Sequence, residues 1–181
     1  MHSDDRQLLV GIARGRDDCA RELWSRHGPG LTALARAIVG ASAAGDVVQS
    51  ALCRILEVST WRLSRVEHVQ AWLTTLVRRE AANFLRAEKR RRVRDREPRV
   101  AVNEIAADAG GIWGAVDNLP RRFREVIVLK LIAGLSFEQL ALSLGINPNT
   151  AAARYRSAIE SLRESARVED RVLSLRGTGH G

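Results

Sequence analysis

The sequence is short of the residue types that stabilise small secreted proteins and hold metal ions. Cys19 and Cys53 are its only cysteines, and they lie far apart without a CxxC pair. Neither a disulfide framework nor a zinc site is therefore indicated, and both thiols are expected to pack as small apolar side chains. Aromatic residues make up only 4% of the 181 residues and there are 4 prolines, while 45% are apolar. This composition favours packed helices over sheet, in one domain or two small ones.

Long apolar runs are also missing. No run approaches the ~18 consecutive apolar residues of a membrane span. The first residues, MHSDDRQLLVGIARG, are acidic where a signal peptide would be basic. We therefore expect a cytoplasmic protein that does not insert into a membrane.

Lysine is nearly absent, so the positive net charge comes almost entirely from arginine. The formal charge is +8 and the sequence pI is near 11.0, yet lysine occurs only at Lys89 and Lys130. Arginine presents a planar fork of donors that binds phosphate, so an arginine-rich surface indicates a nucleic acid or another polyanion. The alternative is a merely soluble basic surface, as a GC-rich genome would encode. The clustering of the arginines must decide between them.

Apolar residues recur at helical spacing almost throughout, and no stretch alternates with the period of two that a strand would show. We expect a first helix capped by Ser3 and a second that begins at Asp17. The GPG at residues 28–30 predicts a break before a third helix, LTALARAIV, and a fourth begins near Asp46. The longest helix is expected from about Glu67 to Arg94, with a basic end that projects from the bundle.

The helical pattern weakens after Arg94, in DREPRVAVNEIAADAGGIWG, and returns in VDNLPRRFREVIVLKLIAG. Pro120 suits the first turn of the helix in that second stretch, and Gly134 suits its carboxyl-terminal cap. The sequence therefore predicts an all-α fold with two small helical domains, the second containing a helix-turn-helix. The predicted boundaries are residues 1–94 for the first domain, 95–112 for a flexible linker, 113–170 for the second domain and 171–181 for a tail.

The helix-turn-helix is predicted from the residues that start and end its two helices. Ser136 followed by Gln139 forms a capping box that starts one helix. Gly145 ends that helix, and Asn147 with Pro148 starts the next. Two helices joined by a tight glycine-containing turn form a motif whose second helix enters the DNA major groove. The alternative is an ordinary helical hairpin with a solvated face.

The second helix of this motif has a face suited to reading DNA. Ala152 and Ala153 are small enough to allow a close approach, while Asn149 and Arg154 carry the groups that base edges require. The preceding helix offers further arginines for phosphates, which position a protein without specifying sequence. The predicted buried stripe is Ala151, Tyr155, Ala158, Ile159 and Leu162. The predicted DNA-facing residues are Asn149, Ala153, Arg154, Arg156 and Ser157, and the predicted phosphate-binding residues are Arg121, Arg122 and Arg124.

A second basic cluster lies at the end of the long helix, in RAEKRRRVR. Its cations repel one another unless a polyanion neutralises them, and each phosphate contact should steepen the log-log salt dependence by roughly 0.9. A solvated arm is the alternative reading of such a run. The position of the cluster at the end of a well-packed helix favours the functional reading. Its members are Arg86, Lys89, Arg90, Arg91, Arg92 and Arg94.

With these basic helical segments in order, the chain resembles the extracytoplasmic-function (ECF) sigma factors over about residues 4–94 and 113–165. The segment AAGDVVQSALCRILE resembles their region 2.2, and AWLTTLVRREAANFLRAEKRRR resembles regions 2.3 and 2.4. Region 4 is matched by LPRRFREVIVLKLIAGLSFEQLALSLGINPNTAAARYRSAIESLR. The resemblance implies a promoter-specificity factor without cofactor or catalytic residues, whose partners are bacterial core RNA polymerase and promoter DNA. Family members are commonly sequestered by an anti-sigma factor, and the resemblance extends this expectation to the present chain.

The resemblance also implies roles for residues in the first domain. Region 2.2 docks on the polymerase core, and Asp46, Gln49 and Cys53 occupy the corresponding polar face. Regions 2.3 and 2.4 open the duplex and read the minus-10 element, and region 4 reads the minus-35 element. Trp61 lies where the family places a base-capturing loop, although closure of the core is an alternative for it. The implied minus-10 residues are Trp61, Arg79, Asn83, Arg86, Lys89 and Arg90.

The chain departs from the family pattern at several positions. Ser50 stands where a glutamate is common, and Leu52 stands where an aromatic residue is usual, so a weaker contact with the polymerase core is expected. Asn83 replaces an aspartate, and Ala152 and Ala153 replace a lysine and a serine. The promoter preference therefore does not follow from the resemblance.

Three other readings compete with this one. A stand-alone helix-turn-helix regulator would share the motif, although the first 94 residues lack the alternating strands of a receiver domain. A helical adaptor for acidic proteins would share the basic faces. An enzyme is disfavoured, because no metal-ligand spacing, phosphate-binding loop or nucleophile elbow is found. The four histidines are scattered: His2, His27, His68 and His180.

Overall fold

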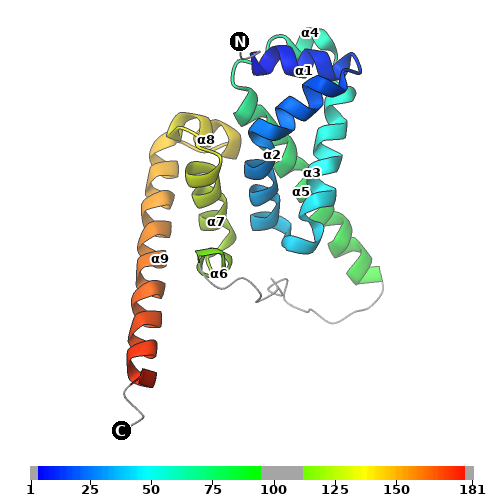
Figure 1. Ribbon diagram of the computed structural model, residues 1–181. Coiled ribbons are helices and arrows are strands. Elements are labelled where there is room, and N and C mark those ends of the chain that lie inside the picture. The colour runs from blue at the N-terminus through cyan, green and yellow to red at the C-terminus, as the bar shows by residue number, and fades with distance from the viewer. Residues whose placement is uncertain (1–3, 95–111, 178–181) are drawn as a thin grey trace.

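The computed structural model describes residues 4–94 and 112–177. Within these ranges all regular structure is helical, which confirms the all-α prediction (Figure 1). The predicted cap Ser3, the predicted flexible linker up to residue 111 and the last four residues of the predicted tail lie outside them. The elements are α1 (Asp5–Ala13), α2 (Asp17–Val39), α3 (Ala41–Leu56), α4 (Thr60–Leu63), α5 (Val69–Arg94), α6 (Ile112–Asp117), α7 (Arg121–Ile127), the π-helical η1 (Val128–Ile132), α8 (Phe137–Leu144) and α9 (Pro148–Gly177).

The break predicted at the GPG of residues 28–30 is wrong, because α2 continues through it. Proline inside a helix removes one hydrogen bond and costs about 3 kcal/mol, so another interaction must offset this loss. Gly30 lies against η1: a Cβ built on it would be 3.3 Å from the Cα of Ala133. This packing and the buried residues on both sides of Pro29 keep the helix continuous. The predicted third helix is the second half of α2, and the next helix begins at Ala41 rather than near Asp46.

Helices α1–α5, which we call the amino-terminal half (residues 4–94), surround one large core. Helices α2, α3 and α5 lie beside one another, and α1 and α4 cover the end at which α5 begins (Figure 1). Apolar residues at helical spacing are buried at Val48, Ala51 and Ile55 of α3 and at Leu73 and Val77 of α5. The amphipathic spacing therefore placed most of this core correctly.

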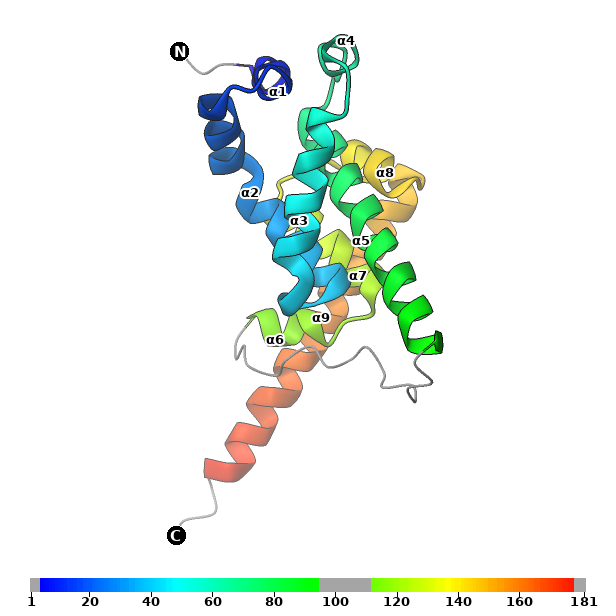
Figure 2. The ribbon, with the colours of Figure 1, turned by 90° about the vertical axis from the view of Figure 1, so that its right-hand side faces the viewer.

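Helices α6–α9 and η1, the carboxy-terminal half (residues 112–177), form a smaller bundle. Helix α9 packs against α6, α7 and α8. Figure 2 shows α7 and α8 against the face that α2 and α5 present, while the far end of α9 extends away from the other helices. None of the described helices combines the length and apolar character that crossing a bilayer requires.

Candidate functional site

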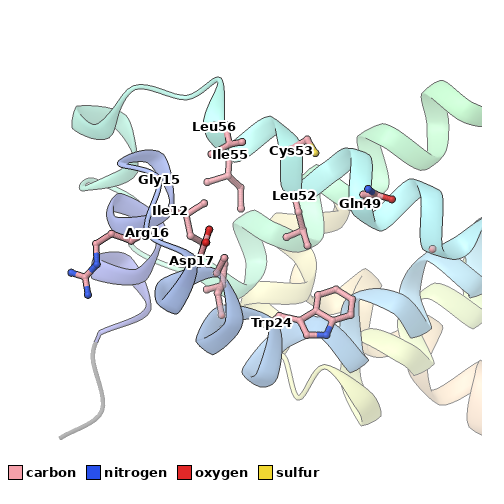
Figure 3. A pocket seen from close by; sticks show the side chains of 13 residues that line it. Ile12, Gly15, Arg16, Asp17, Trp24, Gln49, Leu52, Cys53, Ile55 and Leu56 are labelled. Atoms are coloured by element: carbon pink, nitrogen blue, oxygen red, sulfur yellow. The ribbon is translucent and has the colours of Figure 1, made fainter.

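An apolar groove runs between α1 and α2 on one side and α3 on the other (Figure 3). Its volume is about 540 Å³. Trp24 and Leu56 lie at helical spacing with buried residues of α2 and α3, yet they are 47% and 61% exposed. Leu52 lies beside them on α3 and is half-buried. The groove is therefore an uncovered apolar surface rather than an extension of the core.

The residues predicted to bind the polymerase core lie along this groove. Asp46, Gln49 and Cys53 are all exposed on α3, at the spacing that places residues on one helix face. Gln49 and Cys53 line the groove itself. The expectation that both thiols pack inside is therefore confirmed for Cys19 and wrong for Cys53, which is exposed. The structure thus joins a predicted polar face to an apolar surface that sequence reasoning missed. The sequence did contain an indication of this surface. The apolar residues of α3 extend over more of the helix circumference than one buried face needs.

An ion-pair network connects α3 to α5 beside this surface. The Arg54 guanidinium donates to Glu57 at 2.8 Å and to Glu80 at 3.2 Å. The hydrogen bond to Glu57 is the main cause that raises the pKa of Arg54. Since Glu80 belongs to α5, the pair helps to hold α3 in a defined orientation against that helix.

The basic end of α5 presents an exposed row of polar and cationic side chains. Arg86 donates to the Asn83 side chain at 2.5 Å, one turn earlier on the same face. Glu88 instead pairs with Arg91 at 3.5 Å and with Arg92 at 3.3 Å. Part of the basic cluster is therefore neutralised locally. The predicted minus-10 residues of α5 that are exposed are Arg79, Asn83, Arg86, Lys89 and Arg90.

Trp61 lies apart from that row. Its side chain is 60% exposed on α4, and the Arg65 guanidinium stacks on the ring at 3.8 Å from the centroid. The reading of Trp61 as a residue that closes the core is therefore wrong. The structure does not bring Trp61 and the basic end of α5 together, because α4 lies at the other end of the bundle (Figure 1). Along α5, Val69 and Arg86 are separated by about 26 Å.

The helix-turn-helix is present as predicted. Both bonds of the capping box form: Gln139 N donates to Ser136 Oγ at 3.2 Å, and Ser136 N donates to Gln139 Oε1 at 2.9 Å. Gly145 ends α8 with φ +65°, a conformation that glycine adopts without steric cost. The Asn147 side chain accepts from Asn149 N at 2.8 Å as α9 begins. Local hydrogen bonds thus define the turn.

The first turns of α9 present most of the predicted DNA-facing residues to solvent. The predicted buried stripe packs inward, and the Tyr155 ring meets Phe137 of α8 edge-on at 5.8 Å between centroids. Arg154 is half-buried and lines a cavity of about 450 Å³ with Arg78 of the amino-terminal half and with residues of the carboxy-terminal half that include Arg121. The exposed members are Asn149, Ala153, Arg156 and Ser157.

Arg124 requires a correction. It was predicted to bind phosphate with Arg121 and Arg122, yet it is only 8% exposed and donates to the Asp117 carbonyl at 3.1 Å. Burial lowers the pKa of its guanidinium. A group committed to a buried carbonyl is not available to DNA, so Arg124 is a structural residue of the carboxy-terminal half. A run of three arginines in four positions cannot reveal which one faces inward.

Comparison with known proteins agrees with this architecture. The family "Sigma-70 region 2" matches residues 23–91, and the family "Sigma-70, region 4" matches residues 110–162. The two matches cover more than half of the chain, with one in each helical half. The protein is a sigma factor of the sigma-70 family and of the ECF type.

Two curated relatives cover most of this sigma factor. It is 29% identical to RNA polymerase sigma factor SigV of Bacillus subtilis (strain 168) over 128 residues, which cover 69% of this chain and 76% of SigV. It is 27% identical to RNA polymerase sigma factor CarQ of Myxococcus xanthus over 158 residues, which cover 83% of this chain and 90% of CarQ.

Two solved structures share the fold at 24% identity. CnrH, in complex with the cytosolic domain of CnrY, has a TM-score of 0.62, and the match covers 91% of this chain and 97% of CnrH. The sigma factor RpoE, in complex with the anti-sigma factor NepR from Bartonella quintana, has a TM-score of 0.67, and the match covers 84% of this chain and 98% of RpoE.

Membership in this family settles the competing readings. The sigma factor directs promoter recognition and transcription initiation by RNA polymerase, and it is not an enzyme. A stand-alone regulator would lack the region 2 match that spans α3 and most of α5. The helix-turn-helix therefore acts as one part of a two-part promoter reader.

Proposed function

We propose that this sigma factor uses three separate surfaces, for the polymerase core, the minus-10 element and the minus-35 element. The observation that supports this division is that most of the predicted contact residues are exposed, on three different helices, α3, α5 and α9. These helices bury their remaining faces in the two cores. Each surface is thus held by packing and is presented to solvent.

The polymerase-binding surface consists of Asp46, Gln49 and Cys53 of α3 with the adjoining apolar groove. Burial of exposed apolar side chains is worth about 25 cal/mol per Å², so Trp24 and Leu56 offer affinity that polar contacts alone lack. The carboxylate of Asp46 adds specificity for a cationic partner group. This combination offsets the weaker contact expected from Ser50 and Leu52.

The minus-10 surface is the row Arg79, Asn83, Arg86, Lys89 and Arg90 of α5. These side chains supply a positive track for the DNA backbone next to bases that have left the duplex. Trp61 supplies a stacking platform, which must act on a base well separated from the α5 row. The strand would therefore extend along the bundle between α4 and the end of α5.

The minus-35 surface is formed by the start of α9. Asn149 and Arg154 are proposed to read base edges, and Arg121 and Arg122 are proposed to bind phosphates. Ala153 allows close approach to the groove. Arg156 and Ser157 complete this surface.

The regulator of this sigma factor is proposed to be an anti-sigma factor that covers the α3 groove. The complex of the similar RpoE with the anti-sigma factor NepR supports this proposal. An exposed apolar groove of this size also favours a protein partner. Because the factor must meet core RNA polymerase to act, its place of action is proposed to be the cytoplasm.

Co-migration with core RNA polymerase on gel filtration tests the polymerase surface. Asp46→Arg should abolish co-migration of the purified chain, since it places a cation where an acidic group is proposed to bind one. Glu67→Arg is the matched control, because it makes the same charge change at an exposed residue outside α3 and the groove. Equal loss of binding for both variants, or no loss for Asp46→Arg, would contradict the proposed surface.

Binding to promoter DNA and to scrambled DNA tests the minus-35 surface. Arg154→Ala should weaken binding to the promoter by about 1–3 kcal/mol and to scrambled DNA by much less. Arg122→Ala should weaken both alike and lower the salt slope by roughly one. Equal losses for Arg154→Ala on the two DNAs would remove its role in reading bases.

A further inference from the structure

Four arginines line the cavity of about 450 Å³ that residues of α5, α7, α8 and α9 form together. The lining contains a single acidic residue, Glu125, and its other members are the uncharged Pro120 and Leu144. Four positive charges against one negative charge leave the lining with a formal charge of +3. The four arginines are Arg78, Arg121, Arg122 and Arg154.

Glu125 holds two of these arginines in place. It is only 5% exposed, and its carboxylate accepts from Arg121 Nε at 2.7 Å and from Arg78 Nε at 3.2 Å. Arg78 also donates through Nη1 to the Ser143 carbonyl at 2.6 Å. Each of the two guanidinium groups keeps N–H donors that no described residue accepts from. Donors that are oriented in advance bind a ligand without first losing side-chain freedom.

The other two arginines have no carboxylate partner within residues 4–94 and 112–167. Arg154 of α9 is half-buried, and Arg122 is exposed with its guanidinium 5.0 Å from the centroid of the Phe123 ring. Like charges that line one cavity repel one another, and partial burial strengthens this repulsion. An anion in the cavity removes the repulsion and accepts from the unused donors.

The charge and size of the cavity select the kind of anion. One guanidinium donates two parallel hydrogen bonds to a phosphate group. At pH 7 a single phosphate group carries only about −1.5 to −2, whereas a second phosphoryl group brings the charge of the ligand close to that of the lining. The volume of about 450 Å³ lies within the range of about 300–1,000 Å³ that is usual for small-molecule sites. Pro120 and Leu144 offer an apolar wall for an organic part of the ligand.

Duplex DNA fits this cavity less well than a small anion does. Arg78 lies on α5, away from the proposed minus-35 surface on α9, and its side chain is only 27% exposed. A duplex that rests on α9 meets the exposed Arg122, but it is too broad to enter a cavity of about 450 Å³. A small anion reaches the less exposed Arg78 and Arg154 as well.

We propose that this cavity binds the diphosphate group of a small molecule, either a nucleoside diphosphate or inorganic pyrophosphate. The bound diphosphate occupies Arg122 and Arg154, so that the ligand and DNA compete for these two side chains. This competition rests on the proposed minus-35 surface, whereas the binding site itself does not. The concentration of a phosphorylated small molecule thereby controls how much of the sigma factor binds the minus-35 element.

Isothermal titration calorimetry of the purified full chain with pyrophosphate, ADP and sulfate tests the site. The titrations share one ionic strength and contain no divalent cation. Pyrophosphate should bind one ligand per chain, and sulfate should bind at least about tenfold more weakly, because it offers fewer charges and acceptor oxygens. Tighter binding of ADP than of pyrophosphate would assign a nucleoside diphosphate, and the reverse order would assign the inorganic ion. No binding of either, or equally tight binding of sulfate, would overturn the proposal.

Arg154→Gln removes one cation of the cavity without breaking an ion pair of the described residues. It should weaken pyrophosphate binding about tenfold or more, since a charge-assisted hydrogen bond is lost. Arg163→Gln is the matched control, because it makes the same change at an exposed position of α9 outside the cavity. It lies about 14 Å further along the helix, beyond the screening length of about 8 Å at 0.15 M salt, and should change the Kd by less than about threefold.

A second control separates the cavity from the general positive charge of the chain. Arg91→Gln removes an exposed cation from the basic end of α5 and should leave pyrophosphate binding unchanged. Equal losses for Arg154→Gln and Arg91→Gln would overturn the site, because pyrophosphate would then respond only to overall charge. Circular dichroism checks the helix content of each variant. Arg122→Gln, at an exposed residue of the cavity, replaces Arg154→Gln if the latter does not fold.

Competition with DNA tests the second part of the proposal. Fluorescence anisotropy of a labelled duplex oligonucleotide gives the affinity of the chain for DNA with and without saturating pyrophosphate, at constant ionic strength. Pyrophosphate should weaken DNA binding several-fold, and Arg154→Gln should require about tenfold more pyrophosphate for the same effect. DNA binding without pyrophosphate reports on the minus-35 surface alone, and calorimetry without DNA reports on the cavity alone, so the two can fail separately. Unchanged DNA affinity of the saturated chain would overturn the competition.

Discussion

Helices α1–α5 supply most of one large core, whereas α6–α9 enclose a small core of their own. The cluster that belongs to the carboxy-terminal half alone has four buried members: Val116, Leu119, Ile127 and Ala158. Its other buried apolar residues, including Leu129 and Leu140, pack into the cluster of the amino-terminal half. The amino-terminal half thus supplies most of its own core, whereas the carboxy-terminal half completes its core with its neighbour.

The contact between the halves matters more to one half than to the other. The amino-terminal half holds α3 and its groove in place mainly with residues of its own core. The carboxy-terminal half buries Leu129 and Leu140 in the cluster of its neighbour, so the contact between the halves contributes to its stability.

The largest expected effect comes from a cavity in the shared core. Leu34→Ala removes a fully buried side chain of α2 and should lower the free energy of unfolding by about 2–5 kcal/mol. Both halves should be affected, because this residue belongs to the cluster that they share. Urea unfolding followed by circular dichroism measures the loss.

Two companion variants sharpen that result. Leu142→Ala, at an exposed position, should change stability by less than about 0.5 kcal/mol. Ile127→Ala should speed hydrogen exchange in α7 and α9 while leaving α2, α3 and α5 protected. Equal deprotection of all helices by Ile127→Ala would show that the halves do not differ in independence.

An intermediate effect is expected from the polar contacts between the two halves, where Arg78 of α5 donates to Glu125 at 3.2 Å and to the Ser143 carbonyl at 2.6 Å. Arg78→Ala leaves Glu125 with one arginine partner and the Ser143 carbonyl without this donor, and it should cost about 1–3 kcal/mol. Hydrogen exchange should increase mainly in α7 and α8. Arg78→Lys keeps the charge and should recover part of the loss, whereas a loss confined to α1–α5 would disagree with the comparison.

The smallest expected effect concerns the amino-terminal half at acid pH. Asp5 accepts from Arg26 at 2.6 Å and lies 2.8 Å from His27 Nε2. Burial raises the pKa of Asp5, but the hydrogen bonds from Arg26 and His27 outweigh it and leave the pKa below its ordinary value. In the unfolded chain the pKa of an aspartate is about 3.9, and in the folded protein that of Asp5 is lower. The contacts of Asp5 therefore stabilise the folded protein at pH values above about 3.9, and this stabilisation is lost as the pH falls below that value.

Asp5→Asn measures this contribution. The variant should lose no more than about 1 kcal/mol at pH 6, because the pair is partly exposed, and the difference from the wild type should shrink between pH 5 and pH 3. Urea unfolding at several pH values gives the comparison. A difference that grows toward pH 3 would contradict a lowered pKa of Asp5 in the folded protein.

Features that depend on nearby residues were predictable from the sequence. The capping box of Ser136 and Gln139, the left-handed Gly145 and the buried stripe of α9 form through bonds and spacings within a few residues. The exposure of Asp46, Gln49 and Cys53 likewise follows from helical spacing. The fold class and the helix-turn-helix therefore required no tertiary information.

Features that depend on distant residues were not predictable in this way. Helix α2 runs through Pro29 because Gly30 meets Ala133, which is remote in sequence. Arg124 is buried against Asp117, although its neighbours Arg121 and Arg122 are exposed. Helical spacing identifies an apolar face but does not say whether another helix covers it.

The sequence by itself determined the helices of the recognition motif, the arginine-rich charge and membership in a family with two DNA-reading parts, because each of these is encoded locally or by composition. Only the tertiary structure decided that Trp24 and Leu56 stay uncovered, and that Arg78 and Gly30 hold the two halves together. The physical reason is that burial and close approach belong to pairs of surfaces. Which surfaces meet is known only once the whole chain has packed.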